Sequence, residues 1–317
     1  MYYILSSSTV SHQNTFGKKG FSQSISPLSN SSELIQPNYK DYIDPTMLRR
    51  TSAIIRMSIS CSLDCLKQSE IKQPEAIIVG TGLGCLFDTE KFLDNVLTAN
   101  DSMISPTSFI QSTHNTIAGQ LSIILKNHSY NMTHTQNTLS FEHALQDGML
   151  CLNEGKQSVL VGAADEYIAI LDDISKLIFF KEHRLTSGAS FFMLSKKKSD
   201  NVQARITATA TYGGISSSEQ AIDRFCRENG IKPASIDRIL YSSMEDGFKT
   251  VLEKYFKVVQ LIDFQKYCGI YFSNSAFGVQ LAADMLEHKN DNSKKILVCN
   301  NLHGSNLGLT LIESIET

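Results

Sequence analysis

The amino-acid sequence predicts an α/β fold that is built from two similar halves. Strand-like apolar runs alternate with helical patterns, and this alternation passes twice along the 317 residues. Four of the runs are almost continuously apolar, which is typical of strands that are covered on both faces. These four runs are residues 76–80, 157–163, 237–241 and 295–300.

The predicted first half spans residues 1–200 and begins with a strand at 1–10. Residues 11–44 are rich in Ser, Asn and Gln and are expected to form loops. Asp44-Pro45-Thr46 opens a helix, because proline suits the first helical turn, and apolar spacing continues this helix to about Ser69. The other elements expected here are strands at 76–80, 157–163 and 187–194, an extended segment at 130–136, a helix at 88–98 and a long helix ending near Gly155.

The strand at 76–80 leads into a glycine-rich turn, Gly-Thr-Gly-Leu-Gly at 80–84. This turn matches only part of the G-x-G-x-x-G pattern that holds a dinucleotide. Glycines that permit a tight turn at the end of a strand are the favoured interpretation. We therefore expect no cofactor here.

The second predicted half, residues 201–317, repeats the same kinds of element. It opens with a strand at 204–214 and closes with two strands around a glycine turn in 294–313. Between them the sequence predicts helices at 218–230 and 274–286, strands at 237–241 and 258–264, and a helix after the first of these strands.

Composition excludes several classes of function. The net charge of −3 lacks the clustered Lys and Arg that nucleic acid requires, and the run Lys196–Lys198 is interpreted as a solvated turn. No apolar run reaches the ~18–20 residues of a membrane helix. Seven scattered cysteines indicate a reduced, cytoplasmic protein. Cys61 and Cys65 have no nearby motif that would complete a metal site, so we expect no metal.

The segment 104–166 carries the strongest signal. It contains Ile-Ser-Pro at 104–106, the pattern N-x-x-A-G at 115–119, the extended segment 130–136, a long helix and the strand-like VLVGAADE. This order resembles the part of a β-ketoacyl synthase that leads up to and past its nucleophile. The resemblance implies a thiolase-like fold, with two duplicated halves in αβαβα layers.

The same resemblance places the reactive cysteine at position 138, but this position holds Thr138, and no cysteine occurs from 86 to 150. The family's H-G-T-x-T motif matches the stretch from Ser242, and its G-H-x-x-G-A-x-G motif matches the stretch around Phe272. Both histidine positions are therefore substituted. We expect no catalytic residues of the family type, and we interpret His134 and His143 as packed or interface residues.

The pattern is similar to the chain length factors, which are non-catalytic partners of type II polyketide ketosynthases, and more narrowly to the subunits of aryl polyene and flexirubin pathways. This similarity implies a heterodimer with an active ketosynthase, which is served by an acyl carrier protein. The implied interface strand is Asn131, Met132, Thr133, His134, Thr135 and Gln136. The segment implied to close the acyl tunnel is Ser112, Thr113, His114, Asn115, Thr116 and Ile117.

Two alternatives remain open at this point. The chain could be an active acyltransferase or hydrolase of the same fold with a Thr or Ser nucleophile, since Ser242-Ser243-Met244-Glu245-Asp246 supplies hydroxyls and carboxylates. It could also be a homodimeric scaffold that binds an acyl group.

Overall fold

The fold is a computed structural model that describes residues 1–98, 105–178, 184–199, 202–257, 259–288 and 293–315. Its ten strands form one sheet in the order β3-β2-β4-β5-β1-β6-β10-β9-β7-β8. The first five strands and the last five repeat the same internal order, and β1 and β6 join the two sets. The predicted α/β fold with two duplicated halves is therefore confirmed. The boundary predicted at 200/201 lies outside the described residues, and the division into two domains stays a prediction.

The strands occupy most of the predicted ranges. Those of the first half are β1 (Tyr2–Val10), β2 (Ala76–Gly80), β3 (Tyr130–His134), β4 (Val159–Asp165) and β5 (Gly188–Ser195). Those of the second half are β6 (Ala204–Gly213), β7 (Arg238–Ser243), β8 (Gln260–Asp263), β9 (Lys295–Asn301) and β10 (Asn306–Glu313). Every residue of β2 and β4 is buried, and only end residues of β7 and β9 are not, as their continuous apolar runs predict.

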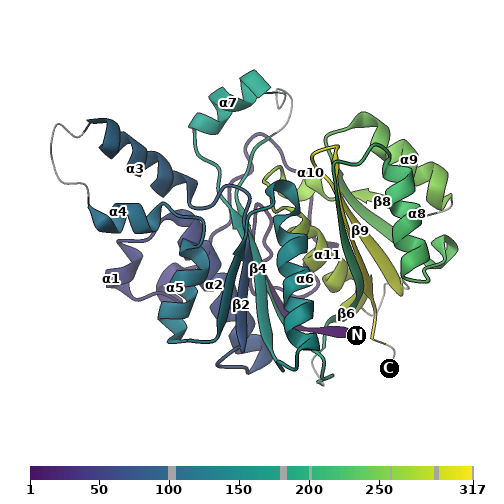
Figure 1. The fold of residues 1–317 in the computed structure, drawn as a ribbon, viewed down its shortest axis with the longest axis horizontal. Helices are drawn as coiled ribbons and strands as arrows, with labels where there is room; N and C mark the ends of the chain where they lie inside the picture. Colours follow the sequence, from purple (N-terminus) through teal and green to yellow (C-terminus); the bar gives the residue numbers. More distant parts are fainter. Residues whose placement is uncertain (99–104, 179–183, 200–201, 258, 289–292, 316–317) are drawn as a thin grey trace.

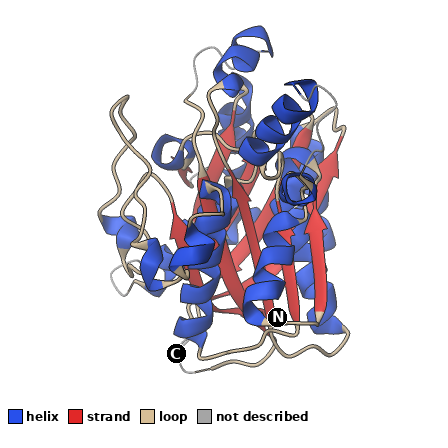
Figure 2. Ribbon diagram, turned by 90° about the vertical axis from the view of Figure 1, so that its left-hand side faces the viewer, coloured by secondary structure: helices blue, strands red, loops and turns tan. Residues whose placement is uncertain are grey.

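The helices form three layers around the sheet (Figure 1). Two central helices, α6 (Ser140–Asn153) and α11 (Ser275–Glu287), lie between the strands of the two halves. The outer layer of the first half contains α2 (Ala53–Ser69) and α5 (Thr116–Leu125), and that of the second half contains α8 (Ser218–Glu228) and α9 (Asp246–Phe256). Figure 2 shows the strands enclosed by these helices. This is the expected αβαβα arrangement.

Short helices complete the fold around these layers. They are α1 (Pro45–Leu48), α3 (Leu86–Thr98), α4 (Pro106–Gln111), α7 (Ile170–Ile178) and α10 (Gln265–Cys268), with 3-10 turns at Phe21–Gln23, Tyr39–Asp41, Asn137–Leu139 and Pro233–Ser235. In Figure 1, α7 stands at the top of the molecule, and α3 and α4 lie at its left side. Within the described ranges, no helix is both long and apolar enough to cross a membrane.

Two predicted elements differ from the structure. The single helix expected from Asp44 to Ser69 is two helices, because the chain becomes extended at Ser52, which precedes α2. The extended segment expected at 130–136 ends as a strand at His134, so Thr135 and Gln136 lie beyond β3. The helix α7 was not predicted from the sequence.

Candidate functional site

The turn between β3 and α6 carries Thr138, at the position where the resemblance expects a nucleophile. Asn137 adopts a left-handed conformation with φ 55°, which bends the chain sharply before α6 begins. The Asn137 Oδ1 atom accepts the backbone N–H of Thr138 at 2.8 Å, and Ser140 Oγ donates to the Asn137 carbonyl at 2.6 Å. Thr138 itself is only 3% exposed. The sharp turn is therefore present, but it presents a buried hydroxyl.

Two asparagines from the second half contact Thr138. Asn300 Nδ2 donates to the Thr138 carbonyl at 2.7 Å, and Asn306 Nδ2 reaches its hydroxyl at 3.4 Å. A threonine hydroxyl needs an adjacent base to act as a nucleophile, and these amide groups can only donate. Thr138 is therefore held in place by contacts from the second half, and these contacts supply no base.

Ser242 lies at the end of β7 and is fully buried. Its hydroxyl donates to Gln265 Oε1 at 3.1 Å and accepts Asn274 Nδ2 at 3.1 Å. It is also directly opposite Asn300 in the β7–β9 ladder, so these two side chains share one face of the sheet. Asn300 thus joins the surroundings of Thr138 to those of Ser242.

Phe272 stands where the resemblance expects the histidine of the second family motif, and its side chain is an apolar ring. A Cβ atom built on Gly82 would lie 2.3 Å from the Phe272 Cβ, so this ring packs where only glycine fits. Phe272 also directly precedes Ser273, whose backbone N–H and hydroxyl donate to Asp165 Oδ2 at 3.0 and 2.6 Å. None of these contacts gives the position an acid or a base.

Glu142 was missed by the sequence analysis. It lies four residues after Thr138, is 2% exposed, and accepts Asn300 Nδ2 through Oε1 at 2.9 Å. Burial raises the pKa of Glu142 to about 7, and this effect is partly offset by the hydrogen bond from Asn300 and by the nearby Ser275 hydroxyl. The available signal was its spacing from Thr138, since residues four apart share a helix face. We call Thr138, Glu142, Ser242, Asn274, Ser275 and Asn300 the central cluster.

The carboxylate of Asp165 joins the loops of the two halves beside this cluster. Its Oδ1 atom accepts the Thr81 hydroxyl at 3.0 Å and the backbone N–H groups of Gly82 and Leu83 at 2.9 and 3.0 Å. Burial is the largest influence on the pKa of Asp165 and raises it, against these hydrogen bonds. The amides of the glycine turn are therefore engaged by a side chain of the protein itself, which favours the tight-turn interpretation.

The histidines near Thr138 in sequence point to another face of α6. His134 Nε2 lies 2.9 Å from Asp147 Oδ2, and the His134 ring stacks on His143 at 6.4 Å between centroids. His143 and Asp147 follow Glu142 by one and five residues, which turns them about 100° or more around the helix from it. Burial and the nearby His134 lower the pKa of His143. This pair borders the exposed edge of β3.

The segment expected to close an acyl tunnel forms the turn between α4 and the start of α5. Ser112 and Thr113 are half-buried and His114 and Asn115 are exposed, whereas Thr116 and Ile117 are buried in this chain. The Ser112 carbonyl accepts the Thr89 hydroxyl of α3 at 2.8 Å, which fixes the turn against that helix. Only the part at 112–115 is presented to solvent.

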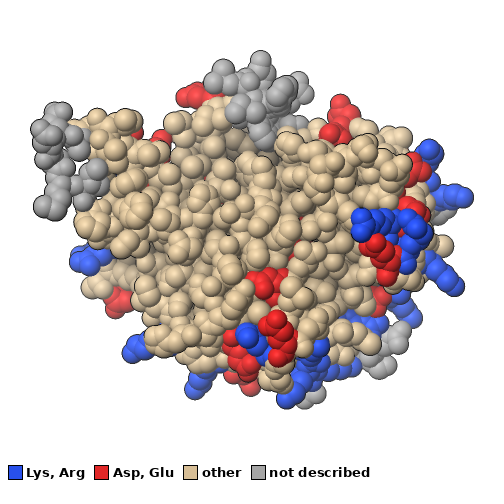
Figure 3. All heavy atoms as spheres, in the orientation of Figure 1, with Lys and Arg blue, Asp and Glu red and all other residues tan. Residues whose placement is uncertain are grey.

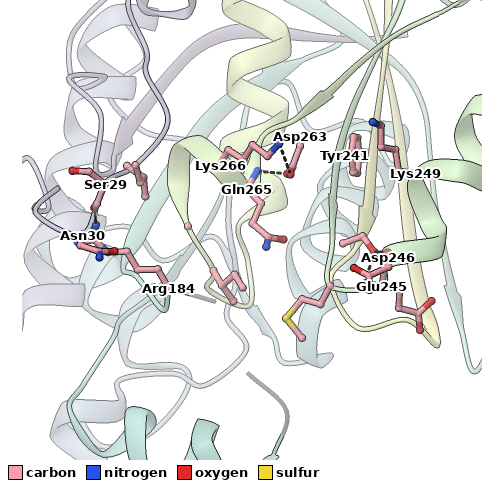
Figure 4. A pocket seen from close by; sticks show the side chains of 15 residues that line it. Ser29, Asn30, Arg184, Tyr241, Glu245, Asp246, Lys249, Asp263, Gln265 and Lys266 are labelled. Atoms are coloured by element: carbon pink, nitrogen blue, oxygen red, sulfur yellow. Dashed lines mark hydrogen bonds and ion pairs between the residues drawn. The ribbon is translucent and has the colours of Figure 1, made fainter. Parts of the chain in front are cut away.

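One pocket, of about 450 Å³, lies beside the stretch 242–246 (Figure 4). Its lining combines Arg184, Lys249 and Lys266 with Glu245, Asp246 and Asp263. Its Ser243 hydroxyl donates to Asn301 Oδ1 at 3.1 Å and accepts the backbone N–H of Glu245 at 3.0 Å.

Two observations weigh against an enzyme with a serine nucleophile. The hydroxyl of Ser243 caps its own loop, and no histidine is found among the described residues that line the pocket. Across the described ranges, no group of three or more His, Cys, Asp or Glu side chains could hold a metal ion. The described residues around 242–246 therefore show no catalytic constellation.

Solved structures of ketosynthase systems share this fold. The ishigamide ketosynthase/chain length factor matches with a TM-score of 0.80, 14% identity and 99% coverage of both chains. A type II polyketide acyl carrier protein complex with its ketosynthase matches with a TM-score of 0.81, also at 14% identity and 99% coverage of both chains. A ketosynthase (ApeO) in complex with its chain length factor (ApeC) from Xenorhabdus doucetiae matches with a TM-score of 0.78 and 11% identity, covering 99% of this chain and 98% of the other.

At the sequence level, no curated protein matches the chain. The family model described as the N-terminal domain of β-ketoacyl synthases matches residues 26–210. That range contains the glycine turn, β3, the Asn137 bend and α6, and it covers more than half of the 317 residues. The chain therefore belongs to the β-ketoacyl synthase family.

Proposed function

We propose that this protein is a non-catalytic, chain-length-factor-like subunit that pairs with an active β-ketoacyl synthase and shapes its acyl tunnel. The product would be a polyketide, a polyene or a fatty-acid-like chain, and the narrower proposal is an aryl polyene or flexirubin pathway. One observation carries the proposal. A sharp turn leads into α6, but Thr138, Ser242 and Phe272 stand at the three positions that the resemblance assigns to reactive residues.

The exposed edge of β3 supports the proposed pairing. β3 is the first strand of the sheet, and its only strand partner in the described chain is β2. The His134 carbonyl accepts the Thr81 N–H at 3.0 Å, so it points toward β2. Backbone groups alternate along a strand, and those of Asn131 and Thr133 therefore point to the open edge. A partner strand can use these groups, and an edge of this kind invites pairing.

The surface around this edge is apolar. Tyr130 and Met132 of β3, Ile123 of α5 and Leu150 of α6 are 38%, 39%, 69% and 59% exposed. Figure 3 shows few charged side chains over the face that carries α5, β2 and α6, whereas charges gather along the lower rim and the right side. Apolar patches with a polar rim are typical of protein interfaces.

The arm formed by α3 and α4 extends the same kind of surface toward the turn at 112–115. Its exposed apolar side chains are Phe87, Leu93, Val96, Leu97, Phe109 and Ile110. The turn lies beside this arm through the bond between Thr89 and Ser112. We therefore propose that 112–115 closes the acyl tunnel of the partner, with Thr116 and Ile117 supporting the turn from inside. The acyl carrier protein would serve the complex through the active subunit.

Co-expression with an active ketosynthase tests the pairing. We expect a stable 1:1 complex on a sizing column, with an interface above the ~2,000 Å² typical of obligate complexes. Thr133→Pro removes an N–H that points to the open edge and should split this complex without disturbing the β2 ladder. Leu261→Pro places the same change on β8, at the opposite edge of the sheet, and should leave the complex intact. The Phe264 N–H donates to the Tyr241 carbonyl of β7, so by the same alternation the Leu261 N–H points to the open edge.

Two outcomes would contradict the proposal. A Thr133→Pro variant that still forms the complex would place the interface elsewhere. A stoichiometric acyl adduct on Thr138, found by mass spectrometry after incubation with an activated acyl thioester, would make the chain an enzyme in its own right.

A further inference from the structure

Three buried oxygen atoms at the centre of the molecule have no hydrogen-bond partner. They are Glu142 Oε2 on α6 and, at the start of α11, Asn274 Oδ1 and Ser275 Oγ. The three residues are 2%, 0% and 1% exposed, so none of them can turn to bulk water. Buried polar atoms without partners are rare and costly, and a group of three in one place needs a physical explanation.

These atoms meet over one face of the sheet. Asn300 lies opposite Ser242 in the β7–β9 ladder and opposite Gly308 in the β10–β9 ladder. Glu142 lies above this row, because Oε1 accepts Asn300 Nδ2 and a Cβ atom on Gly308 would be 2.6 Å from that oxygen. Asn274 lies over the other end of the row through its bond to Ser242.

The Ser275 hydroxyl belongs to the residue that follows Asn274 at the start of α11. It is close enough to the Glu142 carboxyl to influence its ionisation, but the two side chains stop short of full hydrogen-bond geometry. A small rotation of the Ser275 hydroxyl or of the Glu142 carboxyl would complete a hydrogen bond between them.

A count of hydrogen atoms then decides the protonation state. If Glu142 is ionised, the three oxygens share one hydrogen, that of the Ser275 hydroxyl, and one oxygen stays unsatisfied. If Glu142 is protonated, its O–H can donate to Ser275 Oγ, and the Ser275 O–H can donate to Asn274 Oδ1. We propose that Glu142 carries a proton in the folded chain at about pH 6, where a free glutamate is ionised, and that this proton closes the central cluster through Ser275. This inference goes beyond the proposed function and does not depend on a partner.

Electrostatics around Glu142 favour the same state. Burial is the largest influence on its pKa and raises it, while Asn300, Ser275 and its own backbone lower it. No charged side chain contributes to the shift among the described residues. The titratable groups on α6, on the elements that pack around it and on β9, which carries Asn300, are Tyr130, His134, His143, Asp147, Cys151, Asp165, Arg205, Tyr212, Asp284, Glu287, Lys295, Cys299 and Glu313. None of them compensates a carboxylate at position 142.

Infrared spectroscopy tests the proposal directly, because a protonated carboxyl has a carbonyl stretch separate from that of a carboxylate. We expect the difference spectrum between wild type and Glu142→Gln to show the protonated band at about pH 6 and to lose it above about pH 8. Glu166→Gln is the matched control. It removes another buried acid, and the Glu142 band should remain. A difference spectrum with only carboxylate bands at about pH 6 would overturn the proposal.

Ser275→Ala provides a second test that does not require the Gln variant to fold. It removes the acceptor of the proposed proton, so the protonated band should shift toward the frequency of an unbonded acid. An unchanged band in Ser275→Ala would show that the proton does not reach this hydroxyl, and the proposal would fail. Both measurements can be made on the chain alone or in complex, because the infrared bands of the partner subtract out of the difference spectrum between wild type and variant.

Discussion

The Asp165 carboxylate provides the sharpest stability prediction. Its two oxygens accept five hydrogen bonds, three from residues 81–83 and two from Ser273. In Asp165→Asn, one oxygen can keep the first three bonds, but the amide nitrogen must then face the Ser273 N–H, donor against donor. The substitution removes one hydrogen bond to a charged acceptor and makes the other four bonds neutral. Each of these two changes costs about 1 to 2 kcal/mol of the free energy of unfolding.

A neutral side chain also recovers part of the desolvation cost that raises the pKa of Asp165. The net expectation is a loss of about 2 to 3 kcal/mol in the free energy of unfolding, a large fraction of typical stability. Urea unfolding at neutral pH measures this loss, and hydrogen exchange should show faster opening at 81–83 and 273. Glu166→Gln changes the neighbouring acid, which accepts the Phe87 N–H at 3.0 Å, and should cost less.

The reasoning would be refuted by an Asp165→Asn variant within about 0.5 kcal/mol of wild type, the range of ordinary surface substitutions. That result would mean that the five donors find other acceptors. The loops of the two halves would then be held by packing alone, and Asp165 would not be the joint between them.

Two further predictions concern access and pH. The seven native cysteines are all buried and should react slowly with a thiol reagent. The reagent should label Thr138→Cys slowly and Leu150→Cys quickly, because position 150 is 59% exposed. Equal labelling rates would show that the turn at 138 is open. Burial raises the pKa of Glu166 to about 7 from 4.5, so the folded state holds a proton that the unfolded state has lost between these values. The free energy of unfolding should therefore fall by up to about 3 kcal/mol as pH rises from about 4.5 to 7. Glu166→Gln should remove the part of this slope that Glu166 contributes. Parallel pH profiles of wild type and variant in urea unfolding would contradict this prediction.

The sequence predicts the elements whose pattern is local. The four continuous apolar runs become strands buried on both faces, and Asp44-Pro45 opens a helix with the Asp44 side chain accepting the Thr46 N–H. The break before α2 and the helix α7 were not predicted, because no proline or glycine marks the break at 49–52 and α7 follows a loop without a strong cap.

The interior of the site could not be predicted, since its contacts join distant residues. Glu142 and Asn300 are 158 positions apart, and Thr81 and Asp165 are 84 apart. Neither pair has a periodic pattern or a motif that would reveal it. The resemblance assigns the reactive positions of the family to 138, 242 and 272, and this assignment stays a prediction. It could not show that a buried carboxyl, two asparagines and a serine fill the space around them.

The bend at Asn137 positions the elements on both sides of it. A left-handed φ of 55° is tolerated by Asn and Gly but costs other residues about 1 to 2 kcal/mol. Asn137 also binds the Thr138 N–H and the Ser140 hydroxyl, so the bend fixes the start of α6 and hence the height of Glu142 above Asn300. Because β3 enters this bend, the same residue fixes where the open edge of the sheet ends.

Substitutions at Asn137 separate these roles. Asn137→Gly keeps the left-handed bend and loses one side-chain bond, so it should lower the free energy of unfolding by less than about 1 kcal/mol. Asn137→Val forces a branched side chain into the same conformation and should cost about 2 kcal/mol or more. Urea unfolding of the two variants measures the difference. If the two variants lost the same free energy of unfolding, the left-handed conformation at 137 would carry no strain. The bend would then need an explanation other than the placement of α6 and β3.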